Sequence, residues 1–169
     1  MKLPVWMGGA LAGAEFSGDR RFRYVLWRVW DTALPLLGVV MLNPSSAGGE
    51  ADDATIRVVT GRARREGYGG FVVGNLYAFI ATDPADMNRA RREGEDVVGP
   101  ANDATLSRIS AAVGRVWCAW GAPAEPERAA AVLRLLDPLP LVVVGLTRHG
   151  RPRHPLRVPN EAPFLVLHP

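Results

Sequence analysis

The stretch LLGVVMLNPSS, residues 36–46, is an apolar run that ends abruptly in polar turn residues. From Leu36 to Leu42 apolar and polar side chains do not alternate. A continuous apolar run of this length is typical of a strand that is buried on both faces of a parallel sheet. Asn43, Pro44 and Ser45 are residue types that favour turns, so we expect the strand to leave the sheet there.

The same pattern recurs three times along the chain. Short apolar runs at 71–73, 115–119 and 141–144 are each followed by a loop that contains glycine or polar residues. Apolar spacing and capping residues predict helices in the gaps between the runs. These helices are expected to begin after Asp52 or Asp53, after Asn102 or Asp103, and at Glu125.

Alternating strands and helices predict an α/β fold, a three-layer sandwich around a central, mainly parallel four-stranded sheet. Residues 21–30 alternate as a half-buried strand does, and a turn at 31–33 joins them to the run at Leu36. They should add an N-terminal antiparallel strand or hairpin, and residues 164–167 should pair at an edge. Parallel sheets bind ligands outside the carboxyl ends of their strands, so the four loops should converge on one site.

Length and composition narrow the class of protein. The 169 residues fit one domain, residues 1–169, with one core. No apolar segment reaches the roughly 18 residues of a membrane span, so we expect a soluble cytoplasmic protein with no membrane partner. Cys118 is the one cysteine, which excludes an internal disulfide and a centre built on several thiolates; its apolar neighbours predict a buried thiol. We expect no cofactor, no metal and a monomer.

The charge permits a nucleic-acid or nucleotide partner. The formal net charge is +3, and Lys2 is the one lysine among 20 basic residues. Arginine binds phosphate better than lysine does, because its planar guanidinium can donate two hydrogen bonds at once. The arginines near the end of the first helix, Arg62, Arg64 and Arg65, are instead predicted to form a solvated helix face. The chain has no Walker loop, dinucleotide fingerprint, nucleophile elbow or metalloprotease motif.

Polar residues after the first two strands are candidates for a ligand site. Asn43, with Ser45 and Ser46 after it, either forms a plain strand-exit turn or contributes to function. Asn75 either bridges a loop or reads the amide edge of a base, and Tyr77 either joins the core or stacks on that base.

The acidic pair and the last loop supply further candidates. Asp52 and Asp53 are expected to cap a helix, and Asp53 is also a candidate to activate water. His154 is the favoured single site residue; nearby arginines should depress its pKa and keep it a neutral donor. The stiff basic loop around it is suited to phosphate contact through four arginines, namely Arg148, Arg151, Arg153 and Arg157.

Seven short segments, spread over nearly the whole chain, resemble a known protein family. The sequence resembles the domain of unknown function family 1643 in FRYVLWRVW (22–30), MLNPSSA (41–47), DDATIR (52–57), GNLY (74–77), VGPAND (98–103), CAWG (118–121) and RHPL (153–156). That family name implies no activity.

The order of the loop motifs is similar to the uracil-DNA glycosylase superfamily. The counterparts are Asn43-Pro44, Asn75, Trp120-Gly121 and His154-Pro155. The resemblance implies a uracil-DNA glycosylase-like fold and three roles: the first-loop residue positions water, Asn75 reads the base, and His154 steadies charge on the departing base. Trp120 and Gly121 would line the base site.

The chain departs from that pattern in three places. Asn43 replaces the Asp of the strongest uracil enzymes, and an amide orients water without accepting its proton. Ser45 stands where those enzymes carry Tyr, and the cysteines of an iron–sulfur branch are missing. One of the two acidic residues, Asp52 or Asp53, is then the substitute base, and Asp53 is the named candidate.

Three functions follow as hypotheses. The first is a hydrolase of N-glycosidic bonds, glycosylase-like, that processes a pyrimidine-like base in nucleic acid or in a nucleotide. The alternative is a non-catalytic module that binds a nucleobase, a nucleotide or nucleic acid. The third is an interaction protein that keeps the fold without the pocket. The sequence does not separate DNA, RNA and free nucleotide.

Overall fold

The apolar run at residue 36 forms β3 (Leu36–Met41) in the computed structural model, which describes residues 2–45 and 52–168. Its six residues are all buried. β3 lies between two parallel neighbours, β4 (Gly70–Asn75) and β5 (Val116–Cys118). The prediction of a central strand buried on both faces is therefore confirmed.

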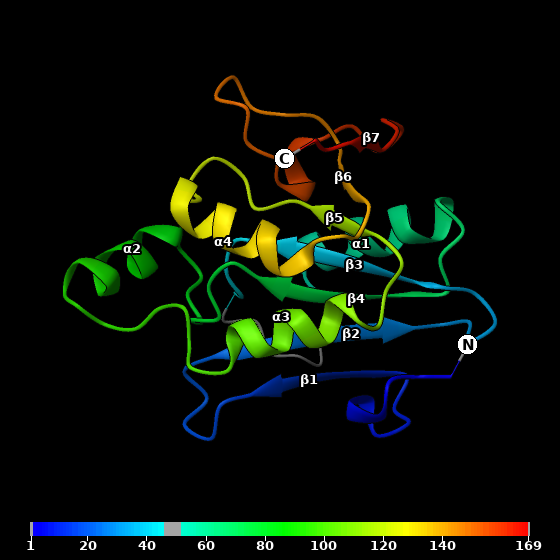
Figure 1. Ribbon diagram of the computed structural model, residues 1–169, viewed down its shortest axis with the longest axis horizontal. Coiled ribbons are helices and arrows are strands. Elements are labelled where there is room, and N and C mark those ends of the chain that lie inside the picture. The colour runs from blue at the N-terminus through cyan, green and yellow to red at the C-terminus, as the bar shows by residue number, and fades with distance from the viewer. Residues whose placement is uncertain (1, 46–51, 169) are drawn as a thin grey trace.

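The sheet in the described residues has seven strands in the order β1-β2-β4-β3-β5-β6-β7, and Figure 1 shows them side by side. Four of them are parallel, as predicted, and antiparallel strands extend the sheet at both ends. The remaining strands are β1 (Ala12–Phe16), β2 (Arg23–Val29), β6 (Leu141–Val143) and β7 (Leu165–Val166).

The layout of the sheet differs from the predicted one in two respects, since β1 is an additional edge strand and β2 is not next to β3. β2 pairs with β1 and β4, so the turn after it does not make a hairpin with β3. β4 lies between β2 and β3 because β3 finds parallel partners on both edges.

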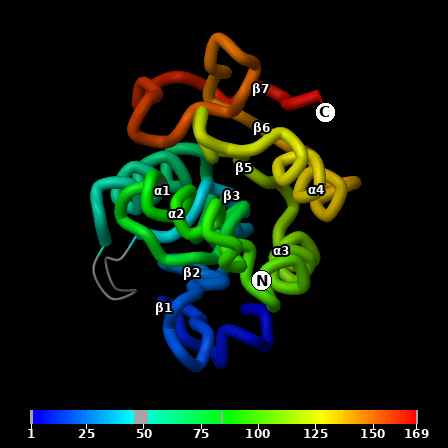
Figure 2. The backbone as a smooth tube through the Cα atoms, turned by 90° about the vertical axis from the view of Figure 1, so that its left-hand side faces the viewer, coloured from blue at the N-terminus to red at the C-terminus, as the bar shows by residue number. Residues whose placement is uncertain are grey.

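Helices lie on both sides of this sheet. Figure 2 shows α1 on one side, with α3 and α4 on the other. α2 follows β4 and lies at the end of the sheet to which β3 and β4 point (Figure 1). The helices are α1 (Ala54–Arg65), α2 (Pro84–Arg92), α3 (Asn102–Ser110) and α4 (Pro126–Leu136), and the 3₁₀ turns are η1 (Val5–Met7) and η2 (Pro155–Arg157). None of these helices is long and apolar enough to cross a membrane.

Successive side chains of a strand point to opposite faces of the sheet, and this divides the core into two layers: one between the sheet and α1, the other between the sheet and the pair α3 and α4. Leu37 and Val39 of β3 pack with Val59 of α1, whereas Leu36 and Val40 pack on the side of α3 and α4. Cys118 is fully buried in the second layer, and burial raises the pKa of its thiol to about 12, as expected of a core cysteine.

Capping explains where α1 begins. Asp53 Oδ1 accepts a hydrogen bond of 2.8 Å from the backbone N–H of Ile56, as the sequence predicts. The predicted cap of α3 is wrong: the helix begins after Ala101, with no side-chain cap. Asn102 instead donates to the carbonyl oxygens of Asn75, the last residue of β4, and of Leu76, which follows it.

The basic turn of α1 also differs from its prediction. Arg64 and Arg65 are exposed, but Arg62 is 1% exposed and its guanidinium binds the carbonyl groups of a segment about 100 residues later. The solvated-face interpretation is therefore wrong for Arg62.

Two glycines allow β2, β3 and β4 to approach closely. Gly69 accepts backbone hydrogen bonds from Trp30 and Asp31 and donates to Pro35. A Cβ on Gly69 would overlap the Asp31 carbonyl oxygen, and one on Gly70 would lie 2.6 Å from a carbonyl oxygen of β2. Backbone atoms cannot move aside as a side chain can, so only glycine fits there.

We predict that Gly69→Ala lowers the free energy of unfolding by about 1–3 kcal/mol, the usual cost of overpacking. Gly61→Ala is the matched control. Gly61 lies inside α1 with open space around its Cβ position, so alanine there should raise stability by roughly 0.5–1 kcal/mol. Urea unfolding of the three proteins measures both changes, and equal stability of the two variants would contradict this account.

Candidate functional site

A cavity of about 1170 Å³ lies at the carboxyl end of the parallel strands. It is lined by residues that follow β3, β5 and β6, by the first turn of α1, and by Arg23 at the start of β2. The loops after all four parallel strands therefore contribute to the cavity, as predicted, although the loop after β4 does so only through Ala81 and Thr82 and not through its first residues.

Asn43 lines this cavity from the loop after β3. Its side-chain Nδ2 donates to the carbonyl oxygens of Ala81, at 2.8 Å, and of Pro44, at 3.1 Å. These bonds fix the amide so that Nδ2 serves the fold and Oδ1 is the atom that remains to accept from a ligand or water.

Asp53 joins Asn43 in the cavity at the N-cap of α1. While Oδ1 accepts from Ile56, Oδ2 accepts a hydrogen bond of 3.1 Å from the hydroxyl of Ser45, which also lines the cavity. Two donors hold the carboxylate in one orientation, and each oxygen keeps a second lone pair for a ligand. Asp52, the other residue of the pair, forms an ion pair of 3.0 Å with Arg28 and does not line the cavity.

His154 lines the cavity from the opposite end of the chain. Burial, with the nearby positive charge of Arg157, lowers the pKa of His154, and Asp53 opposes this shift. The ring Nδ1 accepts a hydrogen bond of 3.3 Å from the backbone N–H of Leu156. A neutral ring that accepts at Nδ1 carries its proton at Nε2, so His154 presents an N–H donor.

Trp120 and Gly121 follow β5 and line the cavity, and Gly121 lies beside His154. Trp120 is buried, and Gly121 has a φ of +79°, a conformation that favours glycine. The N–H of Gly121 donates to the carbonyl oxygen of Pro152, which ties this loop to the segment that carries His154.

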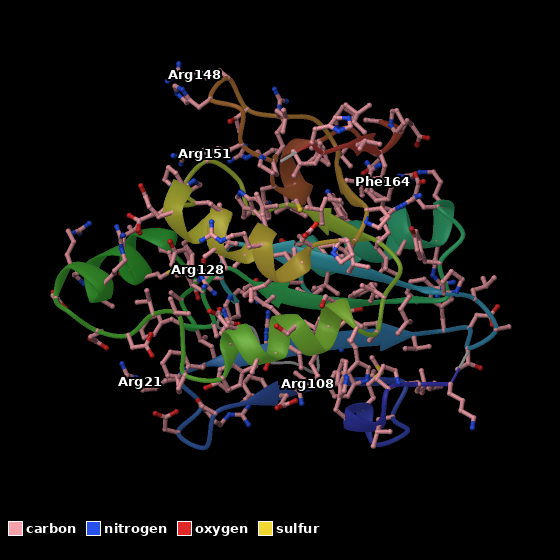
Figure 3. All side chains as sticks on the ribbon, viewed as in Figure 1. Arg21, Arg108, Arg128, Arg148, Arg151 and Phe164 are labelled. Carbon is pink, nitrogen blue, oxygen red and sulfur yellow. The ribbon has the colours of Figure 1, made fainter. Side chains whose placement is uncertain are left out.

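The basic loop, residues 145–157, brings three of its four candidate arginines to the cavity: Arg148, Arg153 and Arg157. Arg153 is braced by a bond of 2.9 Å from Nε to the Leu146 carbonyl oxygen. Arg151 does not line the cavity, because its guanidinium binds the Ala122 carbonyl oxygen. Figure 3 shows Arg148 at the tip of the loop and Arg151 closer to the helices.

Arg23 is a cavity residue that the sequence analysis missed. It is 5% exposed, and burial lowers the pKa of its guanidinium, an effect that Asp53 partly offsets. Its position in the alternating apolar stretch 21–30 predicts that it belongs to a strand, and predicts no role in a site. The one sequence feature that points to such a role is that its charged side chain lies between two aromatic residues, Phe22 and Tyr24. Four arginines thus face one carboxylate among the described lining residues, so the cavity favours anions.

Two predicted ligand residues lie elsewhere. Asn75 and Tyr77 are 1% and 3% exposed and do not line the cavity. Asn75 ends β4 beneath Asn102, where its Oδ1 is buried with no hydrogen-bond partner among the described residues, and burial raises the pKa of Tyr77. Ser46 lies outside the described residues.

No trio of His, Cys, Asp or Glu side chains within residues 2–45 and 52–168 is placed to hold a metal ion. The cavity offers a hydrogen-bond donor at His154, an acceptor at Asp53 and the positive charge of the lining arginines.

Comparison with known proteins places the chain in a family. No curated protein and no solved structure matches it. The model of one family, described as protein of unknown function (DUF1643), matches residues 23–156, which include nearly all of the cavity-lining residues. The chain belongs to the DUF1643 family.

Proposed function

We propose that this protein binds a nucleotide unit, free or within a nucleic acid, and hydrolyses the N-glycosidic bond to its pyrimidine-like base. One observation carries the proposal. His154, a neutral donor, and Asp53, a fixed carboxylate, line the same cavity under an excess of arginines.

Binding would begin with the phosphate. Arg148, Arg153 and Arg157 offer guanidinium forks, which suit phosphate oxygens. The cavity volume exceeds the roughly 300–1,000 Å³ of a typical small-molecule pocket, so a nucleotide with part of its neighbours fits. Trp120, which lines the same cavity as His154, would supply an apolar surface for a base.

The chemistry would divide between the two sides of the site. A water molecule held by Asn43 Oδ1 and Asp53 attacks C1′ of the sugar, and its proton passes to the Asp53 carboxylate. The bond between C1′ and the base nitrogen breaks, and its electron pair goes to the base. The Nε2–H of His154 donates to the base oxygen on which negative charge accumulates. The proton held by Asp53 then passes through solvent to the base anion, so the products are the free base and a sugar with a hydroxyl at C1′, and the carboxylate is restored.

A second candidate is binding without chemistry. This candidate is favoured because the proposed catalytic groups already make hydrogen bonds that stabilise the fold. Asn43 donates to the Ala81 carbonyl oxygen, and both carboxylate oxygens of Asp53 accept local hydrogen bonds. Calorimetry with nucleotides, bases and single-stranded DNA separates the candidates, since tight binding without turnover favours this one.

We predict that Asp53→Asn slows base release by roughly 10²–10⁴-fold, because an amide cannot accept the proton of water. Asparagine caps a helix as well as aspartate does, so α1 should remain folded. His154→Gln should cost about 10²–10³-fold through loss of one donor to the developing charge. The assay follows base release from oligonucleotides and nucleotides with deaminated or modified bases.

Arg134→Ala, on the exposed side of α4, is the control and should behave as wild type. The proposal fails if the wild-type protein releases no base from any of these substrates. It also fails if His154→Gln retains full activity.

We also predict a salt dependence that distinguishes a polynucleotide from a free nucleotide. With three arginine–phosphate contacts, log affinity for an oligonucleotide should fall with log salt at a slope of roughly −2 to −3. Arg153→Ala with Arg157→Ala should flatten this slope by roughly 1.5–2, and Arg134→Ala should leave it unchanged. Fluorescence anisotropy at several salt concentrations measures the slope. A slope near zero would eliminate polynucleotide binding through this loop and favour a free nucleotide.

A further inference from the structure

A segment between η2 and β7, residues 158–164 and here called the strap, runs across the buried side chain of Arg62. Arg62 projects from α1 and donates to three strap carbonyl oxygens, those of Pro159 at 2.8 Å, Asn160 at 3.1 Å, and Ala162. Exposed Arg65, one turn of the helix away, also donates to the Asn160 carbonyl. The strap is thus bound to α1 by side chains rather than by a ladder of backbone bonds.

Aromatic rings enclose the same guanidinium. Its central carbon lies 5.4 Å from the ring of Trp117 in β5 and 5.6 Å from the ring of Phe164 in the strap. Figure 3 labels Phe164, which lies beside β7 and far from the tip of the basic loop. A planar guanidinium can stack on rings and donate in its plane at the same time, which a lysine ammonium cannot do.

The strap continues directly from the segment that carries His154. His154 caps η2, η2 packs against α1, and the strap follows η2. α1 therefore holds Asp53 at its N-terminus and, through Arg62 in its last turns, the far end of the chain segment to which His154 belongs.

We propose that Arg62 is a positioning residue, which fixes the strap against α1 and so keeps His154 seated in the cavity with Asp53. The expected effect of Arg62 on catalysis rests on the proposed function. The expected effect of Arg62 on the position of His154 is independent of that function, because it can be measured without any substrate.

The ring of His154 reports on its own seating. The charged groups that share its cavity are Arg157 of η2, Asp53 of α1, Arg23 of β2, and Arg148 and Arg153 of the basic loop. Burial is the largest cause of its lowered pKa. If the strap loosens, the ring becomes hydrated and its pKa rises toward the ordinary value of 6.5.

The test replaces Arg62 by Met, which keeps an apolar side chain under the rings and removes all three hydrogen bonds to the strap. Imidazole NMR across a pH titration should show the pKa of His154 rising and the Nε2–H tautomer losing its dominance. Proteolysis within residues 158–164 should become faster. Arg62→Lys should fall between wild type and Arg62→Met, since the charge remains and the fork is lost.

Arg64→Met is the matched control. Arg64 lies two residues away on α1, is exposed and stacks on Trp30, so its loss should leave the His154 titration unchanged. If Arg62→Met does not fold, Phe164→Ala loosens the strap from the other side and should shift the titration in the same direction.

The proposal is overturned if a folded Arg62→Met or Phe164→Ala protein titrates at His154 as wild type does. Where wild type releases base, Arg62→Met should lower kcat more than it raises KM, because Arg148 and Arg153 lie in the basic loop away from the strap and only Arg157 belongs to η2. Where wild type releases none, the proposed function fails, and the NMR titration still decides whether Arg62 seats His154.

Discussion

The position of β3 at the centre of the sheet is the constraint on which the other elements depend. Its backbone groups are out of reach of water, so they must be satisfied by partners on both edges. β4 and β5 provide these partners in the parallel sense, and parallel strands require helical crossovers. The crossovers place α1 on one face and α3 and α4 on the other, and they send the loops after β3, β5 and β6 to a common edge.

The parts of this arrangement that local patterns determine are those that the sequence predicts well. The apolar run at Leu36–Leu42, the capping of α1 by Asp53 and the alternation of Val25, Trp27 and Val29 are all found in the structure. β1 was not predicted, because its five residues contain two alanines and a glycine and lack a clear period. The insertion of β4 between β2 and β3 depends on long-range pairing, which no local pattern encodes.

The residues of the candidate site likewise fall into those that local sequence patterns predict and those that they do not. Asn43, Ser45, Asp53, Trp120 and His154 follow strands or cap a helix, and the structure brings them to one cavity. The roles of Arg23 and Arg62 escaped prediction because arginines in a chain with 20 basic residues look like surface charge until burial distinguishes them. Asn75 was placed in the site by its position after a strand, but β4 is covered there by Asn102 and by Arg128, whose Nε donates to the Leu76 carbonyl oxygen at 2.7 Å.

The structure explains why residue 43 is an asparagine and not an aspartate, and this bears on the proposed hydrolysis. Its Nδ2 donates to two carbonyl oxygens, those of Pro44 and Ala81. A carboxylate there would have no proton to donate and would place an anion against both carbonyls, close to the loop that also holds Ser45 and Asp53. The negative charge in this part of the cavity is instead carried by Asp53, where the N-terminus of α1 and the Ser45 hydroxyl stabilise it. An asparagine after β3 is therefore compatible with a hydrolytic site, provided that the carboxylate comes from the helix that follows.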